Sequence, residues 1–210
     1  MQSLFITATG TNIGKTHTTL KLIPLLAARG ISVGVFKPVE TGVTHNAPDA
    51  SRLLEACQKV NSHFSSFSPT EITAYTFPLP AAPFCADTTH TLSLEKIFEK
   101  YQQLSSLCDL LLIEGAGGLM VPLTQEHTMI NLAQMFQSNV LLVTPSRLGC
   151  INDTLLSIEA LKQREIPFEW CVNLYEDKTT FAHVTQPYYD ACFPEWWSVE
   201  EGLARFVARV

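Results

Sequence analysis

The sequence predicts an α/β domain built on a doubly wound, mostly parallel sheet with helices on both of its faces. Short apolar segments alternate along the chain with segments of helical periodicity, which is the pattern of repeated strand–helix units. Several apolar segments are hydrophobic at consecutive rather than alternate positions, as is typical of parallel strands buried on both faces. We therefore expect one domain over residues 1–210, with its ligands bound beyond the carboxyl ends of the strands.

Five strands and five helices are predicted from this alternation. The strands are expected at residues 3–7, 32–37, 110–114, 140–144 and 168–173. The helices are expected at residues 15–28, 48–60, 94–105, 129–136 and 153–164. Residues 61–92 contain many serines and prolines and interrupt the alternation, so we expect a long functional loop there. After residue 173 the pattern weakens, and an aromatic-rich stretch precedes a short final helix.

The composition excludes several classes of protein. Of the 210 residues, 46% are hydrophobic and 16% are charged, which supports a large core and argues against disorder. The net charge of −6, without any lysine- or arginine-rich run, argues against a nucleic-acid partner. No apolar stretch reaches the length of a membrane span, and the N-terminus lacks the features of a signal peptide. Six cysteines without a CxxC pair predict reduced, mostly buried thiols, so we expect a cytoplasmic protein without a membrane partner.

Residues 8–16, Ala-Thr-Gly-Thr-Asn-Ile-Gly-Lys-Thr, lie between the first predicted strand and helix and have the layout of a phosphate-binding loop. In such a loop, backbone amides and the helix N-terminus bind phosphate oxygens. Lys15 would add a mobile positive charge, and the Thr16 hydroxyl would bind Mg²⁺. Thr9 occupies the place of the glycine that commonly opens the loop, and the nearest glycine is Gly10. The alternative is a glycine-rich turn that begins a helix without binding a ligand.

Two further segments follow predicted strands and carry charges suited to phosphoryl transfer. Lys37 ends the second strand, where a second cation would stabilise the transferred group, although a solvated surface lysine is the alternative. Glu114 ends the third strand and precedes the glycine-rich residues 115–118, a position from which phosphate-loop enzymes hold Mg²⁺. A glycine turn with an exposed glutamate is the alternative there. Asp49 opens the helix after the second strand, where the residues alone favour an interaction with the helix dipole.

A fourth segment, residues 148–152, follows the strand at 140–144 and leads into a helix. Free backbone amides at the start of that helix are suited to binding a carboxylate. Cys150 as a nucleophile is the rival interpretation, but no motif ties a histidine to it. The histidines show no metal-binding spacing either. The residues therefore favour ligand binding over catalysis in this segment.

Together, residues 11–16, 37–42, 114–118 and 148–152 resemble dethiobiotin synthetases in order and separation, within a stretch of about residues 1–173. The resemblance implies a phosphate-loop NTPase-like fold and ATP- and Mg²⁺-dependent closure of a ureido ring on 7,8-diaminononanoate with CO₂, in biotin biosynthesis. The implied reaction passes through a carbamate and a mixed carbamic–phosphoric anhydride, which the second amine attacks. The resemblance also implies a homodimer whose active sites are built from both chains.

The same resemblance assigns roles to individual residues. It implies that Lys15 and Lys37 are catalytic and that the metal is held by Thr16, Asp49 and Glu114. The implied nucleotide-binding residues are Asn12, Ile13, Gly14, Lys15, Thr16, His17, Glu114, Gly115, Ala116, Gly117 and Asn173. The implied substrate-binding residues are Thr11, Lys37, Thr41, Gly118, Leu148, Gly149, Cys150, Ile151 and Asn152.

Some positions depart from the family pattern. Ala8, Gly10 and Asn12 stand where the family usually has Gly, Asp and Glu. Leu174 stands in place of the Asp that usually follows Asn173 in the adenine-reading pair, so the choice of nucleobase stays open. A partition or site-placing ATPase is the alternative function. It usually needs a second lysine in the loop and a basic or amphipathic tail, and neither is evident in the sequence.

Overall fold

In the computed structural model, which describes residues 3–210, six parallel strands form a sheet in the order β3-β2-β4-β1-β5-β6. The strands are β1 (Ser3–Ala8), β2 (Val33–Thr41), β3 (Thr73–Phe77), β4 (Leu110–Gly118), β5 (Asn139–Pro145) and β6 (Phe168–Asn173). β1 is buried along its whole length and β4 along its first six residues, because consecutive apolar side chains face helices on both sides. The predicted doubly wound α/β fold is confirmed.

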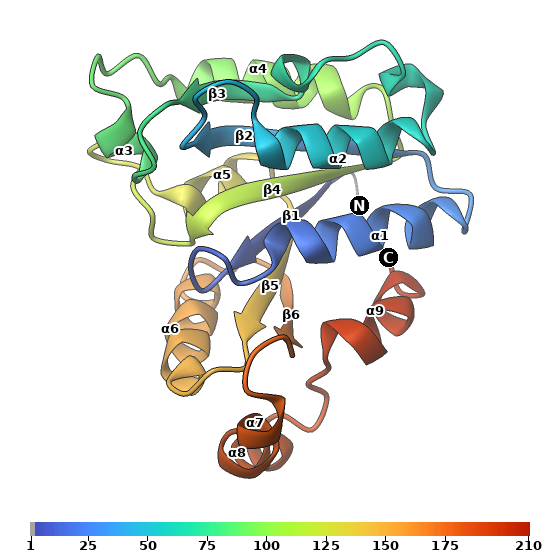
Figure 1. Cartoon of the computed structure of the whole chain (residues 1–210), viewed down its shortest axis with the longest axis vertical. Helices are drawn as coiled ribbons and strands as arrows, with labels where there is room; N and C mark the ends of the chain where they lie inside the picture. The colour runs from blue at the N-terminus through green and yellow to red at the C-terminus, as the bar shows by residue number, and fades with distance from the viewer. Residues whose placement is uncertain (1–2) are drawn as a thin grey trace.

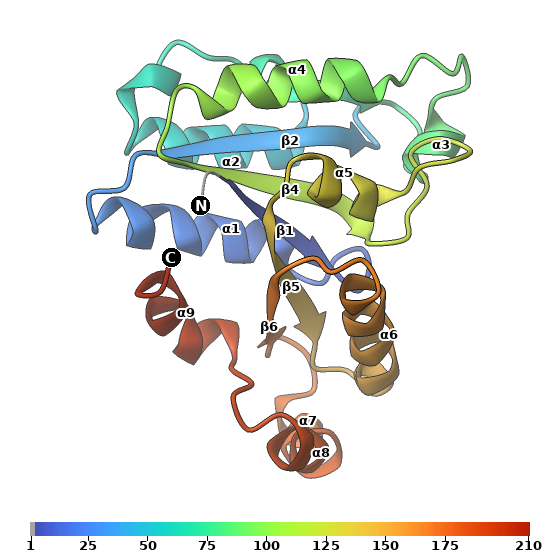
Figure 2. The same ribbon diagram turned by 180° about the vertical axis from the view of Figure 1, so that it is seen from behind.

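Helices cover both faces of the sheet. α1 (Lys15–Ala27), α2 (Pro48–Gln58) and α9 (Val199–Val207) lie on the face toward the viewer in Figure 1. α4 (Leu94–Ser105), α5 (Met129–Met135) and α6 (Cys150–Lys162) lie on the other face, which is in front in Figure 2. Two short helices, α7 (Lys178–Val184) and α8 (Gln186–Cys192), lie beyond the ends of β5 and β6 in both views.

The largest difference from the sequence prediction lies in residues 61–92. In place of one long loop, this segment contains the 3-10 turns η1 (Ser62–Phe64) and η2 (Pro69–Glu71), the edge strand β3 and the short helix α3 (Pro83–Ala86). β3 escapes prediction because an edge strand needs no continuous apolar run. Only its two end residues, Thr73 and Phe77, are buried.

Two strands run further than predicted and carry site residues inside them rather than after them. β2 continues to Thr41 because Lys37 and the residues that follow pair with β3. β4 continues to Gly118, which pairs with Ala8 after a shift in register. A Cβ atom at Gly118 would lie 3.2 Å from the carbonyl oxygen of Thr9, so glycine allows this close approach of two backbones.

The aromatic C-terminal segment forms a second, smaller core. Tyr189 and Phe181 are buried together with Cys150 and Val172, and the Tyr189 hydroxyl donates a hydrogen bond to Thr154 Oγ1 at 3.1 Å. This packing holds the first turn of α6, which begins at Cys150, three residues earlier than predicted. The C-terminal segment therefore supports the helix start at which a ligand was expected.

The six cysteines are free thiols, as predicted. Mostly buried thiols were predicted; Cys57, Cys150 and Cys171 are buried, whereas burial is wrong for Cys85 and Cys192, which are exposed. Within the described residues, no helix is both long enough and apolar enough to cross a membrane.

Candidate active site

The predicted phosphate-binding loop connects β1 to α1 at the edge of the sheet toward which β2 and β4 point (Figure 1). Gly14 has a φ of 108°, a left-handed conformation that favours glycine, and α1 begins at the next residue. Asn173, at the end of β6, donates a hydrogen bond from Nδ2 to the carbonyl oxygen of Ile13 at 2.9 Å. A Cβ atom at Gly14 would lie 2.1 Å from this Nδ2. The loop thus needs glycine at this position, and Asn173 packs directly against it.

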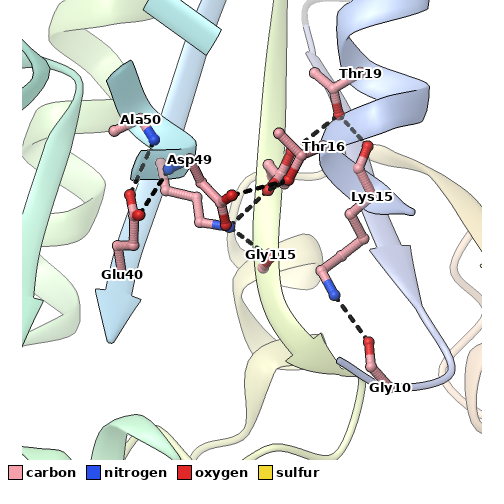
Figure 3. Close-up of polar contacts among 10 residues, drawn as sticks. Gly10, Lys15, Thr16, Thr19, Glu40, Asp49, Ala50 and Gly115 are labelled. Atoms are coloured by element: carbon pink, nitrogen blue, oxygen red, sulfur yellow. Dashed lines mark hydrogen bonds and ion pairs between the residues drawn. The ribbon is translucent and has the colours of Figure 1, made fainter. Parts of the chain in front are cut away.

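Lys15 folds back over its own loop. Its Nζ donates a hydrogen bond to the carbonyl oxygen of Gly10 at 2.9 Å, as Figure 3 shows, and the residue is 8% exposed. Burial and the positive charge of Lys37 lower the pKa of Lys15 to about 8, against the opposing attraction of nearby carboxylates. Two lysines therefore lie close together in a desolvated site, an arrangement that favours an anionic ligand.

Lys37 is the centre of a cluster that joins three elements. Its Nζ, from β2, lies 2.6 Å from Glu114 Oε1 of β4 and 3.1 Å from Asp49 Oδ2 of α2. The Thr16 hydroxyl of α1 lies 2.9 Å from the same Glu114 oxygen and 3.2 Å from Asp49 Oδ1, and it can donate its one proton to one of them at a time (Figure 3). Lys37 is 3% exposed and Glu114 is 0% exposed. The alternatives of a solvated lysine and an exposed glutamate are therefore wrong.

The charges in this cluster shift one another's pKa values. Burial lowers the pKa of Lys37, but the carboxylates of Glu114 and Asp49 outweigh burial, so the net shift is upward. Burial raises the pKa of Asp49, but the charge of Lys37 and its hydrogen bond, helped by the Thr16 hydroxyl, turn the net shift downward. Lys37 is thus held as an ammonium and Asp49 as a carboxylate near neutral pH.

Glu40 is a buried acid of this site that the sequence analysis missed. Its two carboxylate oxygens accept hydrogen bonds from the backbone amides of Asp49 (2.8 Å) and Ala50 (2.9 Å). Burial raises the pKa of Glu40, although the two amides oppose the shift. A carboxyl group inside a buried strand needs hydrogen-bond or charge partners. The position of Glu40 in an otherwise buried strand was the signal that could have identified it.

A cavity of about 620 Å³ opens over the cluster. The predicted site residues that line it are Thr11, Asn12, Gly14, Lys15, Thr16, His17, Lys37, Thr41, Asp49, Ala116 and Gly117. Glu40, Arg52, Val121 and residues 80–83 line it too, and the sequence analysis had assigned none of these to the site. Glu114 lies outside the lining and supports the cavity through Lys37 and Thr16. The cavity therefore joins the phosphate loop to two of the other predicted motifs.

Residues 148–152 are not among those that line this cavity. Leu148 is 72% exposed, whereas Cys150 is completely buried, with its thiol 3.7 Å from the Tyr189 hydroxyl. A ligand at this helix start would therefore meet backbone amides rather than the thiol. Within one chain, the fourth motif stays apart from the other three.

Comparison with known proteins identifies the family. A family model described as an AAA domain matches residues 2–172. The chain is 67% identical over 206 residues to the ATP-dependent dethiobiotin synthetase BioD of Sulfurovum sp. (strain NBC37-1), covering 98% of each chain. It is 39% identical over 198 residues to the protein of the same name from Wolinella succinogenes, covering 90% of this chain and 88% of the relative.

Solved structures of low sequence identity share the fold. A plasmid partition protein from Borrelia burgdorferi has a TM-score of 0.57 at 10% identity, covering 99% of this chain and 98% of that one. The MinC:MinD cell division protein complex of Aquifex aeolicus gives a TM-score of 0.54 at 15% identity, covering 100% of this chain and 86% of that one. At this identity the likeness establishes the fold alone, whereas the near-full-length relatives establish that the chain belongs to the family of ATP-dependent dethiobiotin synthetases.

Proposed function

We propose that this protein uses ATP to make dethiobiotin from 7,8-diaminononanoate and CO₂, a step of biotin biosynthesis, and that it does so in the cytoplasm. The observation that carries the proposal is the position of Lys37. Its ammonium contacts Glu114 and Asp49, the same two carboxylates that lie beside the phosphate-loop residue Thr16. The activity named for the relatives, 67% and 39% identical, supports the same assignment.

Thr16, Asp49 and Glu114 are the residues that would hold Mg²⁺ with the nucleotide. Their oxygens converge at 2.9 and 3.2 Å, and hydroxyl and carboxylate oxygens are the ligands that Mg²⁺ prefers. Among residues 3–210, no three or more His, Cys, Asp and Glu side chains form a group that could hold a metal. The set proposed here has only two carboxylates, and its third member is a hydroxyl. When bound, Mg²⁺ supplies positive charge beside the phosphates.

The chemistry needs electrostatic help and positioning more than acid–base catalysis. One amine of the substrate bonds to the carbon of CO₂ and loses a proton, which gives a carbamate. A carbamate oxygen then attacks the γ-phosphorus of ATP, and ADP leaves. The second amine attacks the carbonyl carbon of the resulting anhydride, loses a proton and expels phosphate. Carbamate and triphosphate are both anions, so Lys15 and Lys37 would bring them together and stabilise the transferred group.

We place the diamine in the same cavity, beside Thr11, Thr41 and the end of β4. Its carboxylate tail would reach residues 148–152 of a second chain, which makes the protein a homodimer with shared sites. Two observations support this arrangement. The segment lies outside the cavity of its own chain, and two nearby leucines are exposed: Leu148, just before α6, is 72% exposed and Leu156, on α6, is 64% exposed.

A mixing experiment tests the shared site. Chains carrying Lys37→Ala and chains carrying Asn152→Asp should each be inactive, but random mixed dimers hold one intact site and should recover roughly a quarter of the wild-type rate. A light-scattering mass of one chain, or no recovery on mixing, would contradict the shared site.

The reaction itself is tested by measuring phosphate and dethiobiotin together, with 7,8-diaminononanoate, bicarbonate and Mg-ATP. We expect one phosphate for each dethiobiotin and only background release without the diamine. Lys59→Ala, which removes an exposed lysine paired with Glu55, is the matched control and should leave the rate unchanged. Turnover that ignores the diamine but responds to DNA or lipid vesicles would replace the proposal with a partition-type ATPase.

A further inference from the structure

Glu40 caps the start of a helix to which it does not belong. α2 is preceded by Ala47, whose side chain has no hydrogen-bond acceptor for the free amides of the first turn. Glu40, inside β2, takes that place with one carboxylate oxygen for the amide of Asp49 and the other for the amide of Ala50 (Figure 3). Glu40 is 4% exposed; its hydrogen bond from the Ala50 amide is buried, and the one from the Asp49 amide is partly buried. The start of α2 is therefore fixed to the central sheet by two hydrogen bonds to one carboxyl group.

The two hydrogen bonds of Glu40 bear directly on Asp49, which belongs to the cluster around Lys37. Asp49 contacts Lys37 at 3.1 Å and Thr16 at 3.2 Å. Its side chain is 38% exposed, far more than those of Lys37 and Glu114, so packing restrains it less. Its backbone amide, by contrast, is held by Glu40 at 2.8 Å. The position of the Asp49 carboxylate thus depends on where α2 begins, and Glu40 sets that position.

We propose that Glu40 is a positioning residue that holds the Asp49 carboxylate at the Lys37–Glu114 pair and so preserves the site for a nucleotide-bound divalent cation. This proposal rests on the metal-binding role given to Asp49 under the proposed function. Glu40 itself needs no contact with the nucleotide, because its two oxygens are already engaged by backbone amides. Outer-shell partners of metal ligands commonly change metal affinity or activity by about 10- to 100-fold when they are replaced.

The first test uses Glu40→Gln, which keeps the size of the side chain but replaces one acceptor oxygen with an NH₂ group. Hydrogen exchange should report faster exchange of the Asp49 and Ala50 amides, with the centre of the sheet unchanged. Calorimetry of ADP binding, with and without Mg²⁺, should report about a tenfold loss of the Mg²⁺-dependent gain in affinity. Binding without Mg²⁺ should stay within twofold of wild type.

The second test is a double-mutant cycle with Asp49→Asn. If Glu40 acts through Asp49, Glu40→Gln should cause no further loss of the Mg²⁺-dependent gain in the Asp49→Asn background. Glu40→Ala, which removes both acceptors, should give a larger loss than Glu40→Gln in the wild-type background and none in the Asp49→Asn background.

Asp87→Asn is the matched control. Asp87 is also a buried carboxylate that accepts a backbone hydrogen bond, from Leu92 at 2.6 Å, but it does not line the cavity. This variant should leave Mg²⁺-dependent ADP binding unchanged. A Glu40→Gln protein that is only less stable, with a normal Mg²⁺-dependent gain, would overturn the proposal, as would losses that add in the cycle. These measurements do not use the diamine, so failure to make dethiobiotin would count against the proposed function and not against the role of Glu40.

Discussion

Lys37→Ala is the substitution whose effect on stability can be worked out from the structure. It removes a cation that lies 2.6 Å from Glu114 Oε1, and both residues are buried. At an effective dielectric constant of about 20, the gross attraction at that distance is about 6 kcal/mol. The cost of desolvating both groups reduces the net value, and removing one partner of a buried pair typically costs about 3–5 kcal/mol. For a chain of this size, we expect the thermal midpoint to fall by about 6–20 °C while the protein still folds.

The same variant separates stability from catalysis. Adding Glu114→Gln to Lys37→Ala removes the unpaired negative charge of Glu114, so the double variant should regain most of the decrease in thermal midpoint. Activity should not return, because the cation proposed to face the transferred phosphoryl group is still missing. We expect dethiobiotin formation to fall by about 10²–10³-fold or more in both variants, the cost of losing one electrostatic group at a transition state.

Calorimetric melting and the dethiobiotin assay at pH 7.5 measure both effects. The folded-state pKa of Lys37 is raised above its ordinary value of 10.5. The stabilisation from the ion pair is therefore fully present below about pH 10 and is lost only as the pH rises through the folded-state pKa. An unchanged midpoint in Lys37→Ala would refute the assigned ion-pair energy. A near-normal rate would remove Lys37 from the mechanism, and a double variant less stable than the single one would show that Glu114 is not the group left stranded.

The phosphate loop, the thiols and the base site each provide a further test. Gly14→Ala places a Cβ atom 2.1 Å from Asn173 Nδ2, at a backbone φ of 108°. The affinity for ADP, measured by calorimetry, should therefore fall at least about tenfold, and an unchanged affinity would contradict the assigned loop geometry. Burial raises the pKa of Cys57 to about 12, so iodoacetamide at pH 8 should label the exposed Cys85 and leave Cys57 unmodified. Peptide mass spectrometry that detects modified Cys57 from the native protein would contradict this. The side chain of Leu174 cannot accept a hydrogen bond from a base, so kcat/KM for ATP should exceed that for GTP or CTP by less than about tenfold. Strict use of ATP would show that adenine is recognised elsewhere.

The grouping of three motifs in the candidate site was predictable because parallel strands share a polarity. Lys37 and Glu114 are 77 positions apart in the chain, yet each was expected near the carboxyl end of a strand and therefore at one edge of the sheet. The exact strand ends were not predictable, since backbone pairing extends β2 and β4 beyond the apolar runs that mark them in the sequence. The edge strand β3 was missed for a related reason. It buries too few side chains to leave a hydrophobic pattern.

The burial and the contacts of individual side chains could not be predicted from sequence patterns. Asp49 alone favoured a role at the helix dipole, and its contacts with Lys37 and Thr16 make it part of the cluster. Glu40 lies inside the recognised segment 37–42 but was given no role, because its contacts are backbone amides nine and ten positions later in the chain. Residues 148–152 carried a recognisable motif, but the structure of one chain leaves them away from the cavity. Local patterns thus predicted candidate residues, and tertiary contacts decided which of them lie together.

The charge balance of the cluster explains why the nucleotide should arrive together with a cation. Lys15 and Lys37 contribute two positive charges, while Glu40, Asp49 and Glu114 contribute up to three negative ones, and each lysine already has an oxygen partner within the protein. A triphosphate alone would have to compete with the carboxylates for the same two ammonium groups. A divalent cation held by Thr16, Asp49 and Glu114 would supply positive charge that removes that competition and leaves Lys37 for the reacting anions. Under the proposed function, ligand binding would rearrange the same ion pair that stabilises the cluster. The stability of the cluster and its proposed catalytic role would therefore depend on the same contacts.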